Sequence, residues 1–153
     1  MPASVATIGS VIRSPLVLPA AIDSAKKAVE LSRAHGAAAD LAFALQVLGR
    51  LLADDDQDEA RARYEEGLEV ARRAEDAVSQ IYLLYALGRL HFRAGDNERA
   101  RELYAEALDL SQQVGERWMA MNVLVELSYV SEDVDAGPAL EEMVGVLGQT
   151  GNR

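Results

Sequence analysis

Cysteine is absent from this sequence of 153 residues, and proline, aromatic and basic residues are scarce. Without cysteine the chain has no disulfide framework, no thiolate nucleophile and no cysteine-based zinc site. Its 15 Lys and Arg residues are outnumbered by 25 Asp and Glu residues, which gives a net charge of −10 at pH 7. Nucleic-acid binders concentrate Lys and Arg, so this balance argues against a broad phosphate-binding surface and against a nucleic acid as partner.

Long apolar runs are missing as well. No stretch approaches the ~20 uninterrupted apolar residues that span a bilayer, and no basic region precedes an apolar run near the first residue, as in a signal peptide. We therefore expect a cytoplasmic protein that does not insert into a membrane. Half of the residues are hydrophobic, with only 4 prolines and 11 glycines, which suits one all-helical domain with a buried core.

An internal repeat organises most of the chain. Residues 84–114 read as a helix, a tight turn and a second helix, and the same order of residues occurs earlier. Leu48 corresponds to Leu87, a shift of 87 − 48 = 39 positions, and Tyr64 corresponds to Tyr104, a shift of 104 − 64 = 40 positions. The one-residue difference falls in the turn, where a change of length costs little free energy. A repeat of this size indicates stacked helical hairpins.

Capping residues and apolar spacing set the expected helix boundaries. Asp56 and Asp96 stand where an N-cap accepts backbone hydrogen bonds, and Gly36 and Gly115 stand where a left-handed residue ends a helix. Between these signals, apolar residues recur at spacings of three and four, as on the buried face of a helix. The predicted helices are Ala20–His35, Ala37–Ala53, Asp56–Ala74, Asp76–Arg93, Asn97–Val114, Glu116–Ser131 and a short last helix that opens at Pro138.

The expected organisation is an irregular N-terminal arm (residues 1–19), a helical repeat domain (residues 20–148) and a frayed tail (residues 149–153). Pro15 and Pro19 interrupt any long helix in the arm. One interpretation makes the arm either an irregular segment that lies over the first helix or a degenerate first helix. The other makes it an apolar segment that docks on a second copy or on the missing part of a larger protein. The last helix is apolar and weakly charged, which favours packing on another chain, as in a homodimer, or an origin in a longer chain.

Residues 84–91 (LYALGRLH), followed by Ala100-x-x-x-Tyr104, resemble the tetratricopeptide repeat pattern W-x-x-L-G-x-x-Y…A-x-x-x-F. Here Leu stands in for Trp, His for the first Tyr and Tyr for Phe. Because the repeat exceeds the usual ~34 residues, it resembles the elongated variants of kinesin light chains and of large bacterial transcriptional regulators. The resemblance covers most of residues 20–147. It implies an all-α fold, a superhelical stack of antiparallel helix pairs with about three repeats.

An acidic run between two predicted helices matches part of a calcium-binding loop. Asp54, Asp56, Asp58 and Glu65 take the first, third, fifth and twelfth positions of that loop. However, Glu59 stands where the loop needs glycine, and Glu65 should already lie inside a helix. A solvated turn in which Asp56 caps the next helix is the better interpretation, and we expect no bound metal.

No catalytic arrangement stands out either. The only two histidines, His35 and His91, lack the second His or Glu four residues away that a helical metal site requires. Neither a nucleophile elbow nor a phosphate-binding loop frames the serines and aspartates. We therefore expect neither an enzyme nor a cofactor.

The resemblance also implies a binding surface, because the first helices of such repeats line a concave groove at the second, fifth, ninth and thirteenth positions. Arg50 and Arg89 share one of these positions, and should stack as a positive strip suited to carboxylates. Tyrosine and arginine dominate binding hot spots. Alternatively, these arginines pair with local carboxylates such as Glu126 and Asp54 and bind nothing. The predicted groove residues are Phe43, Gln46, Arg50, Tyr82, Tyr85, Arg89, Arg93, Asn122, Glu126 and Tyr129.

Three classes of function stay open. The first is a protein–protein interaction module that binds an acidic or C-terminal peptide, or a helix with carboxylates on one face, or that assembles with itself. The second is the sensor or regulatory domain of a larger bacterial transcriptional regulator, although no helix-turn-helix or phosphate loop is present. The third is a small-molecule binder or unconventional enzyme that uses the tyrosines at 82, 85 and 129, which would require a deep closed cavity.

Overall fold

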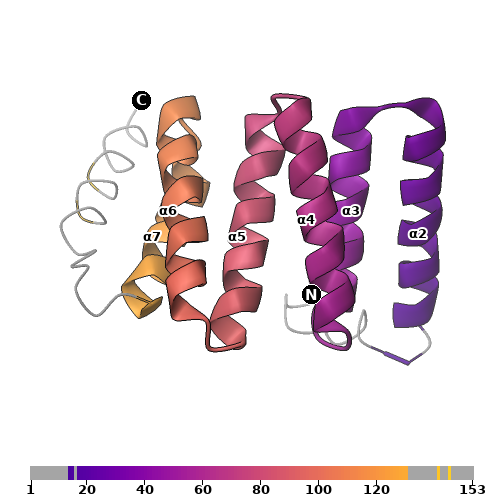
Figure 1. The fold of residues 1–153 in the computed structure, drawn as a ribbon, viewed down its shortest axis with the longest axis horizontal. Helices are drawn as coiled ribbons and strands as arrows, with labels where there is room; N and C mark the ends of the chain where they lie inside the picture. The colour runs from indigo at the N-terminus through magenta and orange to yellow at the C-terminus, as the bar shows by residue number, and fades with distance from the viewer. Residues whose placement is uncertain (1–13, 16, 131–140, 142–144, 146–153) are drawn as a thin grey trace, which may run out of the picture. The chain divides into compact units, whose positions relative to one another are not determined.

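The computed structural model describes residues 14–15, 17–130, 141 and 145, and within them the fold is all-α (Figure 1). Neighbouring helices in the sequence pack against one another, as in an α-solenoid, so the predicted fold class is confirmed. The helix predicted to open at Pro138 and the predicted frayed tail lie outside the described residues. The described helices are α2 (Leu18–His35), α3 (Ala38–Leu52), α4 (Gln57–Arg73), α5 (Ala77–Arg93), α6 (Asn97–Val114) and α7 (Arg117–Val130).

These boundaries agree with the predicted ones to within a residue or two. The main difference is at α2, which begins at Leu18 and has Pro19 in its first turn, whereas the predicted helix begins at Ala20. The first backbone N–H groups of a helix have no partner within it, so a proline that lacks this group is tolerated there. Pro19 therefore opens α2 and does not interrupt it. Most of the predicted N-terminal arm lies outside the described residues.

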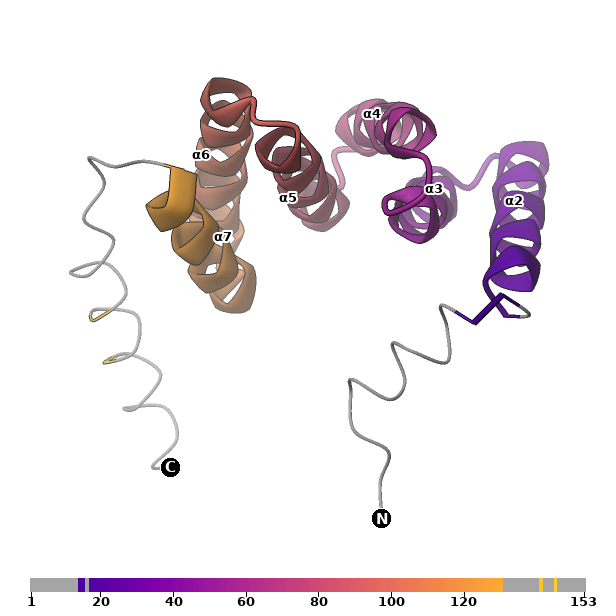
Figure 2. The ribbon, with the colours of Figure 1, turned by 90° about the horizontal axis from the view of Figure 1, so that it is seen from below.

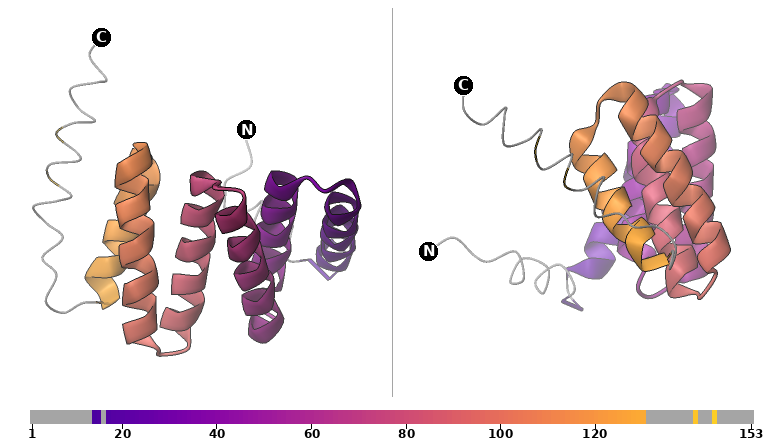
Figure 3. Two further views of the ribbon diagram at one scale, coloured as in Figure 1. Left: turned by 45° about the horizontal axis from the view of Figure 1, so that its top comes forward. Right: turned by 90° about the vertical axis from the view of Figure 1, so that its left-hand side faces the viewer.

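The chain divides into two compact units, an N-terminal unit (Met1–Val70) and a C-terminal unit (Ala71–Arg153). In the N-terminal unit, α2 and α3 lie side by side and are joined by a tight turn (Figure 3). In the C-terminal unit, α6 packs against both α5 and α7, and α5 also contacts α7 (Figure 2). The boundary between the units falls near the end of α4.

Aspartates at the turns determine where three of the helices begin. Asp56 Oδ1 accepts a hydrogen bond from the Glu59 backbone N–H at 3.0 Å, and Asp96 Oδ1 accepts one from the Arg99 N–H at 3.2 Å. Asp76 Oδ1 does the same with the N–H of residue 79, at 3.1 Å. Each carboxylate satisfies a donor that has no partner in the first turn and also lies at the positive end of the helix dipole. The predicted caps at Asp56 and Asp96 are confirmed.

Left-handed residues end three of the helices with the same pair of hydrogen bonds. After α5 the Gly95 N–H donates to Phe92 O at 3.0 Å and the Asp96 N–H donates to His91 O at 2.9 Å. After α4 the Glu75 N–H donates to the carbonyl of residue 72 at 3.1 Å, and the next N–H donates to that of residue 71 at 2.9 Å. This is the Schellman arrangement. Gly36 and Gly115, the predicted helix ends, have φ values of +68° and +78°, as this conformation requires.

A glycine and a tyrosine interlock in the same way in both full repeats. A Cβ atom added to Gly49 would lie 2.5 Å from Cε1 of Tyr64, and one added to Gly88 would lie 2.5 Å from Cε1 of Tyr104. Both tyrosines are buried. The glycine of the L-G motif therefore leaves room for the aromatic ring of the second helix, which explains why the two residues recur together.

Candidate functional site

The best-defined polar cluster lies where α5 and α7, the first helices of two successive repeats, contact each other. The Tyr85 hydroxyl donates a hydrogen bond to Glu126 Oε1 at 3.1 Å. Arg89 Nε lies 3.9 Å from the same oxygen, which is an ion pair but too long for a hydrogen bond. We call these three residues the Tyr85–Arg89–Glu126 cluster. The sequence predicted all three as groove residues, and the structure brings them together.

Aromatic rings support the cluster from one side. The guanidinium carbon of Arg89 lies 5.9 Å from the centroid of the Tyr85 ring, within the range of a cation–π interaction. The Tyr85 ring in turn lies 6.1 Å from the ring of Tyr104, at an interplanar angle of 47°. The Arg89 side chain remains 57% exposed, whereas Glu126 is only 20% exposed. The arginine is therefore held by neighbouring groups and still faces solvent.

Burial and the Glu126 carboxylate shift the titration of both tyrosines. Desolvation is the largest cause that raises the pKa of Tyr85, and the negative charge of Glu126 raises it further. The pKa of Tyr104 is raised strongly for the same two reasons. The Tyr104 hydroxyl is buried and has no hydrogen-bond partner among the described residues. Both hydroxyl groups are therefore neutral at physiological pH, and the cluster's charge is that of Arg89 and Glu126.

The other predicted groove residues of the C-terminal unit differ in how far they are exposed. Tyr82 is half-buried, and Arg93 is exposed at the end of α5. Asn122 is half-buried, and its Nδ2 donates to the Trp118 carbonyl one turn earlier at 2.8 Å. Tyr129 is 70% exposed and Trp118 is 65% exposed. Trp118 is not among the predicted groove residues, although its spacing of four residues from Asn122 places both on one face of α7.

The predicted residues of the N-terminal unit lie on α3. Phe43 is 63% exposed, Gln46 is half-buried, and Arg50 is exposed and forms no ion pair with any described residue. Arg50 and Arg89 belong to different units, so the positive strip that they should form stays a prediction. Arg89 pairs with Glu126, whereas Arg50 forms no ion pair with a described residue, so the alternative of local pairing without binding also stays a prediction.

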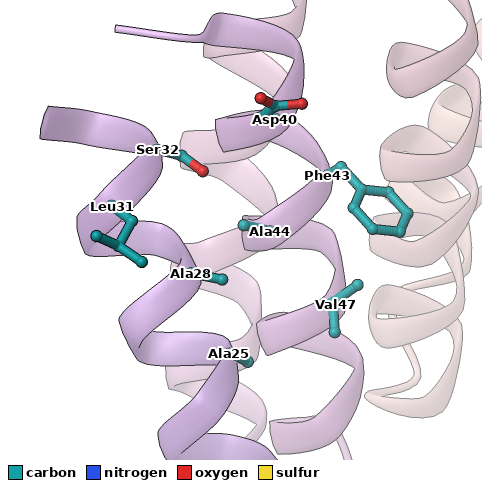
Figure 4. Close-up of a pocket in the computed structure, with 8 residues that line it drawn as sticks. All are labelled: Ala25, Ala28, Leu31, Ser32, Asp40, Phe43, Ala44 and Val47. Carbon is teal, nitrogen blue, oxygen red and sulfur yellow. The ribbon is translucent and has the colours of Figure 1, made fainter. Parts of the chain in front are cut away.

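A largely apolar pocket of about 410 Å³ lies between α2 and α3 of the N-terminal unit. Figure 4 shows the side chains of the two helices that line it. The only charged lining residue is Asp40, and two large apolar residues at the pocket, Leu31 and Phe43, are 60% and 63% exposed. The lining residues are Ala25, Ala28, Leu31 and Ser32 from α2, and Asp40, Phe43, Ala44 and Val47 from α3.

Both histidines make local contacts. His91 Nδ1 lies 3.1 Å from Asp96 Oδ2, so it joins the last turn of α5 to the residue that caps α6. Backbone hydrogen bonding from Arg99, followed by the contact with His91, lowers the pKa of Asp96. His35 Nδ1 lies 2.7 Å from the carbonyl oxygen of Leu31 in its own helix. Among the described residues, no group of three His, Asp or Glu side chains is arranged to hold a metal ion.

None of the described helices is long and apolar enough to cross a membrane. Taken together, the recurrent caps, the glycine–tyrosine pairs and the packed helical hairpins define an α-helical repeat protein. A family model described as Tetratricopeptide repeat matches residues 53–113, from the end of α3 to the end of α6. This part of the chain is therefore of the tetratricopeptide-repeat type, as the sequence motif predicted. Repeats of this type generally bind proteins or peptides and generally act as scaffolds without catalytic activity. No sequence of a curated protein matches the chain.

Proposed function

We propose that the face shared by α5 and α7 binds a peptide segment of a partner protein, and that Arg89 receives a carboxylate of that segment. The observation that carries the proposal is the position of Arg89, which is 57% exposed and held beside the Tyr85 ring and Glu126. A guanidinium that neighbours already orient loses little side-chain entropy when it binds a carboxylate in a bidentate manner.

Aromatic side chains on the same two helices supply apolar contact area for such a segment. Tyr85 lies within the cluster, and Trp118 and Tyr129 are exposed on α7. Tyrosine, tryptophan and arginine are the residue types that contribute most to binding energy at interfaces. A carboxylate-bearing segment that also carries apolar residues therefore suits this face better than a purely charged one.

The test uses four labelled peptides of one apolar sequence. One carries glutamates, one carries glutamines at the same positions, and each is made with a free or an amidated C-terminus. Binding is measured by fluorescence anisotropy with the wild type, Arg89→Glu and the matched control Arg99→Glu, whose arginine pairs with Glu102 on α6. We expect Arg89→Glu to weaken binding of the carboxylate peptides at least tenfold, and Arg99→Glu to leave it within twofold.

The pattern across the peptides distinguishes the source of the carboxylate. If the glutamate peptides bind regardless of amidation, side-chain carboxylates are recognised, and if only free C-termini bind, the terminus is recognised. Equal affinity for all four peptides, or equal losses in Arg89→Glu and Arg99→Glu, would contradict the proposal. Light scattering on both variants provides the comparison with self-assembly, because a dimer that Arg89→Glu alone converts to a monomer would make this face the homodimer interface.

A further inference from the structure

The helix pair that forms the pocket has a counterpart in the C-terminal unit at one constant shift. Ala25 of α2 corresponds to Tyr104 of α6, and Leu48 of α3 corresponds to Leu127 of α7, since 104 − 25 and 127 − 48 both equal 79. The two second helices, α2 and α6, each contain 18 residues and each end in a left-handed glycine. The α2–α3 pair and the α6–α7 pair are therefore the same structural unit.

In the C-terminal unit a first helix covers the surface that forms the pocket in the N-terminal unit. The counterparts of pocket residues Ala25, Ala28 and Ala44 are Tyr104, Ala107 and Val123, and all three counterparts are fully buried. The helix that contacts both α6 and α7 is α5. No described helix takes the place of α5 beside α2 and α3, and Leu31 and Phe43 are exposed there. The pocket therefore corresponds to the surface on which α5 packs in the C-terminal unit, and it is apolar as such a packing surface requires.

The sequence ahead of α2 continues the repeat at the same shift. Val5-x-x-Ile8-Gly9-x-x-Ile12 stands 79 positions before Leu84-x-x-Leu87-Gly88-x-x-His91, since 88 − 9 = 79. The N-cap of α2, Val17, corresponds in turn to the N-cap of α6, Asp96. In α5 the residues at the Val5, Ile8 and Gly9 positions are buried, whereas Arg89, at the Ser10 position, is exposed. At these four positions the segment is apolar or glycine where α5 is buried and polar where α5 is exposed.

We propose that residues 4–13, which lie outside the described residues, occupy this pocket in the same chain, at the position that α5 takes beside α6 and α7. Val5 and Ile8 then lie against α2, and the array gains a complete repeat ahead of α3. The proline at 15 stands at the position of Ala94, the C-cap that follows α5, so it comes after the segment that corresponds to α5. This proposal is independent of the peptide-binding proposal.

The contacts expected between the segment and α3 are apolar, unlike those of the C-terminal unit. In that unit Tyr85 and Arg89 of α5 contact Glu126 of α7. The counterparts are Ala6 and Ser10 in the segment and Val47 in the pocket. Small residues opposite a valine suit close packing of two helices, and they present no carboxylate–arginine pair. This match favours the chain's own segment over an acidic or basic partner helix.

The absence of native cysteine makes the position of the segment measurable by cross-linking. In the full chain, Ala6→Cys is combined with Val47→Cys, and the control combines it with Ala62→Cys, an exposed position on α4. Under mild oxidation or with a short bismaleimide, we expect the first pair to cross-link within one chain at least fivefold faster than the control. Equal rates in the two pairs, or cross-links only between chains, would overturn the proposal, and the latter result would assign the pocket to a second copy.

Urea denaturation of the full chain tests the same proposal without cross-linking. Ile8→Asp places a charge at the position of the buried Leu87, whereas Ser10→Asp places one at the position of the exposed Arg89. We expect Ile8→Asp to lower the urea midpoint of the full chain by about 0.5–1 M, because burial of the apolar face is lost. Ser10→Asp should leave the midpoint unchanged. Equal midpoints for wild type and both variants would contradict the proposal.

Discussion

At the scale of single residues, Glu75 adopts a backbone conformation that glycine adopts in the equivalent turns. Its φ is +54°, and it is the only described residue other than glycine with a positive φ. It occupies the left-handed position of the Schellman turn after α4, where Gly95 and Gly115 stand after α5 and α6. An L-residue in this conformation costs about 1–2 kcal/mol, partly offset by the lower flexibility of its unfolded chain compared with glycine.

We therefore expect Glu75→Gly to increase the free energy of unfolding by about 0.5–1 kcal/mol. The converse change, Gly95→Ala, should lower it by a similar amount, because it introduces the same strain at φ +82°. Urea denaturation followed by circular dichroism measures both differences. Destabilisation by Glu75→Gly would show that contacts of the glutamate side chain outweigh the backbone strain.

At the scale of helices, α5, α6 and α7 share a group of tyrosines whose titration is linked to folding. The pKa values of Tyr85 and Tyr104 are raised in the folded protein, chiefly by desolvation and then by Glu126. A group whose pKa is raised by folding contributes its full stabilisation below the pKa of the unfolded chain. That stabilisation is lost as the pH rises towards the folded pKa. The unfolded value for tyrosine is about 10.

We expect the free energy of unfolding to fall as the pH rises above about 10, and to fall less steeply in Tyr104→Phe. Below that pH, Tyr104→Phe should be neutral or slightly stabilising, because it removes a buried hydroxyl that has no partner among the described residues. Tyr129→Phe is the control, since its ring is 70% exposed and should not change the slope. The measurement is the urea midpoint of each protein across this pH range. If the midpoints of Tyr104→Phe and the wild type fall with pH at the same slope, the linkage between Tyr104 titration and folding is disproved.

At the scale of the whole molecule, the acidic composition governs how the chains interact in solution. A net charge of −10 at pH 7 keeps copies apart by repulsion, while the isoelectric point is about 4.6. Exposed apolar side chains such as Trp118 and Tyr129 then become available for association when the charge is neutralised. We expect solubility to decrease several-fold between pH 7 and pH 5, measured as protein remaining in solution after centrifugation. Constant solubility over this interval would show that charge repulsion does not control association.

Local signals predicted most of the fold correctly. The spacing of apolar residues, the aspartate caps at Asp56 and Asp96 and the glycine at Gly115 determine helix type and boundaries, because each acts within one turn of the chain. The sequence predicts that Pro19 interrupts a helix, whereas in the structure it opens α2, because a proline in a first turn and one in a helix interior give the same local sequence signal. Trp118 lies outside the repeat positions that define the groove, so the sequence does not predict its place beside them.

The sequence by itself determined the helix order and the repeat, since both follow from the spacing of apolar and capping residues. Only the tertiary structure decided which polar groups meet. Tyr85 and Glu126 are 41 residues apart and share a hydrogen bond because α5 and α7 contact each other. The pocket between α2 and α3 likewise depends on which face each helix leaves uncovered. Periodicity identifies the buried face of a helix, but the groups that reach its exposed face depend on how neighbouring helices pack.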